Sequence, residues 1–123
     1  KFFVAILQTL RGDGPYEIDI KGASEIMLYE TQNRRGFNQR AIYQQGKAIE
    51  ASGSRLEELN KISMPTLIVH GKADPLIIFD HALKYAPLIP HAEQLFIDGM
   101  GHDIPLIYLG KVHEAIFRNL SKN

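Results

Sequence analysis

The chain has 123 residues, which suffices for one domain and excludes a two-domain enzyme. Hydrophobic residues make up 45% and charged residues 23%, the balance of a folded globular protein, and the lack of cysteine excludes disulfides, thiolate nucleophiles and cysteine-based zinc sites. The 14 basic and 14 acidic side chains cancel and no apolar run reaches the roughly 18 residues of a membrane span, so we expect a soluble, cytoplasmic protein with neither nucleic acid nor a membrane as partner.

The first 60 residues predict helices. Apolar residues recur at helical spacing in three stretches, 3–10, 23–32 and 38–51. Turn residues from Gly12 to Pro15 end the first helix, and Gly53 lies just past the third. Ser54 with Glu57 three residues later predicts a capping box for a brief fourth helix that runs to about Asn60. No convincing strand flanks these helices, so we expect their apolar faces to pack against something else.

From about residue 61 the pattern changes to that of an α/β protein. Two continuous apolar runs, 66–70 and 94–97, are bounded by Gly or Pro, which is typical of strands covered on both faces. Helical spacing follows each run, over 79–88 and 106–120. The order strand, helix, strand, helix predicts one βαβ crossover of a parallel sheet and a final covering helix.

Two features predict that the chain is part of a longer protein. A parallel sheet of two strands is marginal in water, so the second half fits the trailing edge of a larger sheet. The chain also begins at Lys1 and has its first methionine at Met27. We therefore expect a segment upstream.

Candidate catalytic residues follow the two predicted strands. Functional groups of open α/β sheets lie in the loops beyond the carboxyl ends of the strands. Asp74 follows the first strand and His102 follows the second, so we expect their side chains to meet at one edge of the sheet. A carboxylate that accepts a hydrogen bond from an imidazole Nδ1–H fixes the ring's tautomer and stabilises the imidazolium that forms when Nε2 takes a proton. Asp74 and His102 are therefore our candidate acid and base.

Other interpretations of these residues remain. Asp74 also suits a turn before Pro75, and His102 also suits a structural histidine that caps the last helix. Their joint order and spacing favour the catalytic pair. Three further aspartates are rival acids: Asp80, Asp98 and Asp103. Asp80 is the second choice among them. The other histidines have no metal-ligand spacing and are predicted to be structural or solvated, so no metal or cofactor is implied.

A family resemblance rests on three stretches of the second half. The run from Pro65 to Leu76, followed by Ile89 to Ala92 and then Gly99 to Pro105, resembles the carboxyl-terminal part of the α/β-hydrolase family. In that family the last two strands deliver the acid and then the histidine of a catalytic triad. The resemblance implies these roles for Asp74 and His102.

The resemblance also implies a domain organisation. It covers about residues 62–121 and is greatest to small-molecule esterases with a Gly-Met-Gly-His loop, among them the polyketide methyl esterases. Residues 1–60 would correspond to the family's helical cap and residues 61–123 to its carboxyl-terminal α/β part, so the fold class is a fragment of an α/β-hydrolase. Three side chains of the helical region either line an apolar pocket under the cap or hold helices together: Met27, Phe37 and Tyr43.

The nucleophile of the family is absent from the sequence. It should precede the acid and the histidine in a Gly-x-Ser-x-Gly elbow after a strand. The nearest match, Gly22 to Ile26, lacks the last glycine and follows no predicted strand. The family's His-Gly loop, which contributes to the oxyanion hole, is missing as well. We therefore expect the chain alone to be inactive and a serine outside it to attack.

Two hypotheses from different classes follow. The first is a hydrolase that cleaves a carboxylic ester or similar bond of a small apolar molecule, with that molecule and the missing amino-terminal half as partners. A carboxylate nucleophile in that half would instead make the parent a dehalogenase or an epoxide hydrolase. The second is a non-catalytic module that binds another protein, or itself as a homodimer, through its helices and the strand edge at 67–69.

Overall fold

The computed structural model describes residues 2–34, 36 and 38–122. In chain order the elements are α1 (Phe2–Leu10), α2 (Ile20–Asn33), α3 (Gln39–Ser52), the 3₁₀ helix η1 (Leu56–Lys61), β1 (Leu67–Gly71), α4 (Phe79–Tyr85), the 3₁₀ helix η2 (Ala86–Leu88), β2 (Glu93–Ile97) and α5 (Leu106–Leu120). The predicted order of strand, helix, strand, helix in the second half is confirmed. Within the described residues, no helix combines the length and the apolar character needed to cross a membrane.

Two helix boundaries differ from the sequence prediction for local reasons. The second helix begins at Ile20, because the Asp19 side chain caps it by accepting a 2.9 Å hydrogen bond from the Gly22 N–H. The helix predicted over 79–88 is divided into α4 and η2. Pro87 lies at the start of η2, and a proline has no N–H with which to continue the α-helical ladder.

The predicted capping box at Ser54 is wrong. The short helix is a 3₁₀ helix that begins at Leu56, and its cap residue is Arg55, whose side chain makes no cap hydrogen bond. The Ser54 hydroxyl accepts a long bond of 3.4 Å from the Leu56 N–H instead. A capping box needs α-helical geometry in the first turn, which the tighter 3₁₀ turn does not provide.

The two strands form a parallel pair. Leu67 lies opposite Glu93, and Gly71 lies opposite Ile97. Each strand lies within one residue of its predicted range. The carboxyl ends of both strands therefore meet at one edge of the sheet, from which the next two loops start.

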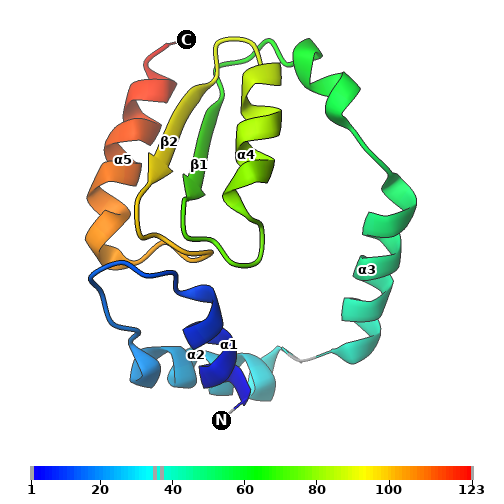
Figure 1. The fold of residues 1–123 in the computed structure, drawn as a ribbon. Helices are drawn as coiled ribbons and strands as arrows, with labels where there is room; N and C mark the ends of the chain where they lie inside the picture. The colour runs from blue at the N-terminus through cyan, green and yellow to red at the C-terminus, as the bar shows by residue number, and fades with distance from the viewer. Residues whose placement is uncertain (1, 35, 37, 123) are drawn as a thin grey trace.

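Helices cover both faces of this sheet, and in Figure 1 the strands lie between α4 and α5. On one face Ile97 packs with Val112 of α5, and Val69 lies against this cluster. On the other face Ile68 packs with Ala86 of η2. This coverage explains why the strands are continuously apolar in sequence, since neither face is left to water.

The helices of the first half are more exposed to solvent than the sheet and the helices that cover it. Every residue of α3 is exposed, and Figure 1 shows this helix apart from the sheet. The accessible surface of the chain is 9361 Å², whereas a compact protein of 13.9 kDa exposes about 6,700 Å². The exposed surface includes large apolar side chains, such as Ile42 and Ile49 of α3, and it leaves room for contact with other parts of a protein.

Of the apolar side chains considered for a pocket under the cap, the structure describes Met27 and Tyr43, and neither lines the cavity beside the sheet edge. Met27 lines a hollow of about 300 Å³ between α1 and α2. Tyr43 is 67% exposed on α3, and Phe37 falls outside the described residues. For Met27 the packing interpretation fits the structure better. The assignment of residues 1–60 to a cap stays a prediction.

We expect stability to depend on the sheet layers and not on α3. Replacing Ile68, which is 6% exposed, with alanine should lower the free energy of unfolding by about 2–4 kcal/mol. The matched control Ile49→Ala, at a position 65% exposed on α3, should change it by less than about 0.5 kcal/mol. Urea unfolding followed by circular dichroism measures both free energies. Equal losses in the two variants would contradict the expectation that the sheet layers, and not α3, stabilise the fold.

Candidate functional site

The loop after β1 holds the Asp74 carboxylate in a fixed orientation. Asp74 is 8% exposed, and its Oδ1 accepts hydrogen bonds from the N–H groups of Leu76 at 2.8 Å and Ile77 at 2.9 Å. Pro75 lies between Asp74 and these donors and contributes no N–H of its own. This side-chain turn leaves Oδ2 directed away from the loop's own backbone.

The loop after β2 turns sharply to present His102. Gly99 has a φ of +71°, which favours glycine, and Met100 is 3% exposed beneath the turn. The His102 N–H donates to the Leu10 carbonyl at 2.8 Å, so the main chain of the histidine is held at the end of α1.

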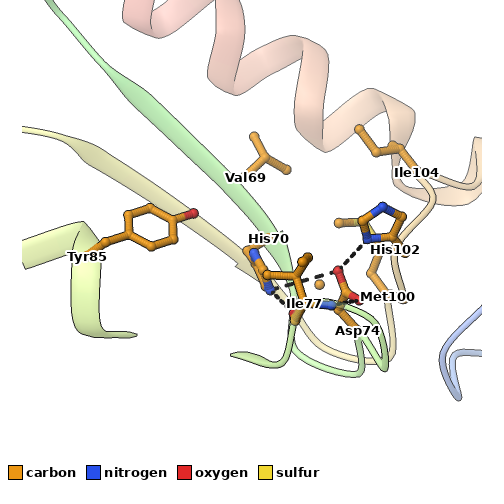
Figure 2. A pocket seen from close by; sticks show the side chains of 10 residues that line it. Val69, His70, Asp74, Ile77, Tyr85, Met100, His102 and Ile104 are labelled. Carbon is orange, nitrogen blue, oxygen red and sulfur yellow. Dashed lines mark hydrogen bonds and ion pairs between the residues drawn. The ribbon is translucent and has the colours of Figure 1, made fainter. Parts of the chain in front are cut away.

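The two side chains meet, as predicted. His102 Nδ1 lies 2.9 Å from Asp74 Oδ2, and the dashed line in Figure 2 marks this contact. The His102 side chain is 38% exposed and that of Asp74 only 5%. One buried carboxylate thus holds a ring whose outer side reaches solvent. The helix-cap interpretation of His102 is not supported, because α5 begins after Pro105 without a side-chain cap.

The environment of Asp74 favours its ionised form. Burial raises the pKa of the carboxyl, but the hydrogen bonds from His102, Ile77 and Leu76 outweigh it and lower the pKa below the usual value. An ionised carboxylate only accepts hydrogen bonds, so the bond requires an Nδ1–H on His102. In the neutral ring Nε2 is then free to accept a proton.

The rival acids lie elsewhere. Asp80 is exposed in the first turn of α4. The Asp98 carboxylate is 88% exposed and pairs with Lys72 at 2.9 Å. Asp103 is exposed beside the histidine. Of the four candidate acids, Asp74 is the one that bonds to the His102 ring.

Two contacts of the site were not foreseen from the sequence. The first is between the segment after α1 and the histidine loop, where the Gly14 N–H donates to the Gly99 carbonyl at 2.8 Å. A Cβ at Gly101 would lie 2.1 Å from the Leu10 carbonyl oxygen, so this approach requires a glycine. The turn residues that follow the first helix thus also form the surface on which the histidine loop packs. Glycines at 12, 14, 99 and 101 are the only signal of it in the sequence.

The second unforeseen contact involves His70, which was predicted to be structural or solvated. It is 9% exposed at the end of β1, and its Nε2 lies 2.9 Å from the Ile77 carbonyl oxygen. The same nitrogen lies 4.0 Å from Asp74 Oδ2. No motif of the sequence pointed to this contact.

Two cavities adjoin at Ile104. The smaller, of about 220 Å³, is lined by Asp74, His102 and their neighbours. The larger, of about 550 Å³, is mostly apolar and lies between the start of α2 and the start of α5. Among the described side chains, no three His, Asp or Glu residues converge in the manner of metal ligands.

The glycine contact predicts a test of the docking between the first helix and the histidine loop. Gly101→Ala should lower the free energy of unfolding by about 1–3 kcal/mol through steric overlap and speed the exchange of the His102 amide hydrogen. Gly110→Ala in α5, where an added Cβ meets no atom within 4 Å, is the matched control and should not destabilise the fold. Hydrogen exchange measured by NMR checks both, and unchanged His102 protection in Gly101→Ala would count against the contact.

The lowered pKa of Asp74 predicts how stability depends on pH. A carboxyl whose pKa is lower in the folded state stabilises the fold above its unfolded pKa, here near 3.8, and this contribution is lost as the pH falls through the folded pKa. The native protein should therefore exceed Asp74→Asn in stability most at neutral pH, and the gap should shrink below about pH 4. Urea unfolding at neutral pH and at about pH 3 measures it, with Asp80→Asn as the control. A gap of constant size would contradict an ionised Asp74.

Comparison with known proteins finds relatives for about half of the chain. No family model matches the chain. It is 36% identical over 69 residues to alpha/beta hydrolase domain-containing protein 17C of Xenopus tropicalis, and 35% identical over 69 residues to the proteins of that name from mouse and human. Each match takes in 53% of this chain and 21–22% of the relative, so the chain spans about a fifth of the length of the relatives it matches. Through this half of its length, the chain is related to the α/β-hydrolase family.

Proposed function

We propose that this chain supplies the acid and the histidine of a serine-type hydrolase that cleaves a carboxylic ester or similar bond of a small apolar molecule. The observation that supports this most is the 2.9 Å contact between a buried Asp74 carboxylate and a partly exposed His102 ring. The relationship to α/β-hydrolases agrees with it.

In the proposed reaction, His102 moves protons and Asp74 orients it. Nε2 of His102 takes the proton from the serine hydroxyl as its oxygen attacks the ester carbonyl, and it returns the proton to the leaving alcohol. Asp74 holds the Nδ1–H and stabilises the imidazolium that forms in between. A water molecule then releases the acid by the same steps in the second half of the reaction.

The proposed nucleophile belongs to a segment that these 123 residues do not contain. Ser24, in the stretch nearest to a nucleophile elbow, lies inside α2 and donates its hydroxyl to the Ile20 carbonyl at 2.6 Å. The large exposed surface of the chain leaves room for such a segment to pack. If the segment instead carries a carboxylate nucleophile, the parent is a dehalogenase or an epoxide hydrolase.

The apolar cavity beside the pair supports an apolar substrate. It holds about 550 Å³, within the range of small-molecule sites, and Ile104 borders both this cavity and the one that contains the pair. Ile26 and Leu106 line it from opposite sides. A hydrocarbon group placed there would have its ester bond near His102.

A second candidate function, an interaction module, is favoured by the free strand edges. In the described sheet each strand has one neighbour, so each leaves one edge without a partner. Sedimentation of the 123-residue chain tests pairing through this edge. The backbone groups of Thr66 and Lys72 bond to β2, so by alternation the N–H of Val69 points to the free edge. A homodimer that dissociates when a proline replaces Val69, with the circular dichroism of the fold kept, would support the module, and a monomer of the unchanged chain would count against it.

The hydrolase proposal is tested by activity on a p-nitrophenyl ester once the nucleophile-bearing segment encoded upstream is joined to the chain. His102→Ala and Asp74→Asn should each lower kcat by about four orders of magnitude, because proton transfer and the ring's tautomer are lost. Asp80→Asn removes an acid of the same charge away from the pair and should leave kcat unchanged. Full activity in His102→Ala would reject the proposal, and loss in Asp80→Asn alone would reassign the acid.

A further inference from the structure

A third side chain contacts the Asp74 loop. His70 is the next-to-last residue of β1, on the face covered by α4, and the centroid of its ring lies 6.1 Å from that of Phe79. Its Nε2 lies 2.9 Å from the Ile77 carbonyl oxygen. A carbonyl only accepts hydrogen bonds, so Nε2 carries a hydrogen and His70 donates. In Figure 2, His70 and His102 lie on opposite sides of Asp74.

The hydrogen bond from His70 holds Ile77, and Ile77 in turn holds the Asp74 carboxylate. Ile77 donates its N–H to Asp74 Oδ1 and accepts the His70 N–H at its carbonyl. Both sides of the Ile77 α-carbon are thus held, one by the acid and the other by the strand end. Ile77 is 42% exposed, so few packing contacts of this residue would otherwise keep the loop in place.

We propose that His70 is a positioning residue that anchors the turn from Asp74 to Ile77 to the end of β1 and so keeps Asp74 Oδ2 directed at His102. Its effect on catalysis rests on the proposed function, whereas the positioning itself needs no turnover to be measured. His70 contacts the loop and not the reacting atoms, and the nearer of its contacts is a backbone carbonyl.

Two substitutions of similar polarity separate a hydrogen-bonding role from simple packing. His70→Gln places an amide N–H near the position of Nε2, and His70→Asn is one methylene shorter and does not reach the Ile77 carbonyl. NMR of the 123-residue chain measures two signals, the pKa of the Asp74 carboxyl and the low-field proton on His102 Nδ1. His113→Asn, at an exposed position on α5, is the control.

We expect His70→Asn to raise the pKa of Asp74 toward its usual value near 3.8 and to broaden the His102 proton signal, while His70→Gln and the control keep both. If Asn and Gln have equal effects, or neither has one, the proposal is overturned, since a lost ring or a packing defect would act alike in both. In the complete hydrolase, His70→Asn should lower kcat by up to about 100-fold with KM unchanged.

The two proposals fail in different ways. An assay in which His102→Ala has no effect on turnover rejects the hydrolase and leaves the NMR result on His70 standing. Equal NMR signals in His70→Asn and His70→Gln reject the positioning role, whatever the assay gives.

Discussion

The parallel pairing of β1 and β2 is the constraint on which the site depends. Because Gly71 lies opposite Ile97, both strands end at one edge, and the loops that follow start side by side. Residues far apart in the chain can then share a 2.9 Å hydrogen bond. A change of strand order or direction would separate Asp74 from His102 even if every residue of both loops were kept.

Around this pair the structure adds restraints on both partners. The Asp74 carboxylate is held at Oδ1 by two backbone N–H groups and, through Ile77, by His70. The histidine is held at its own N–H by the Leu10 carbonyl, so the end of α1 contacts the histidine loop directly. The helical first half and the α/β second half are thus joined at the point where the chemistry is proposed to occur. A movement of α1 would reach His102 through one hydrogen bond.

The sequence predicts local and chain-ordered features well. Continuous apolarity located both strands, and the order of Asp74 and His102 after them predicted their contact, because parallel topology leaves few alternatives. It could not predict contacts that depend on how loops approach one another. His70 looks in sequence like any strand-end histidine, and the glycines at 12 and 101 look like ordinary turn residues. The capping box at Ser54 failed because the short helix is a 3₁₀ helix that begins at Leu56, and the Ser54–Glu57 pattern does not distinguish such a turn from an α-helix.

An ionised Asp74 holds a hydrogen on Nδ1 of His102 and leaves Nε2 of the neutral ring free to accept a proton. Long-range ¹H–¹⁵N NMR of the neutral imidazole distinguishes the two ring nitrogens directly. We predict a protonated Nδ1 and an unprotonated Nε2 for His102. A ring whose hydrogen resides on Nε2 would contradict the account, because such a ring cannot donate to Asp74 and accept a proton from a nucleophile.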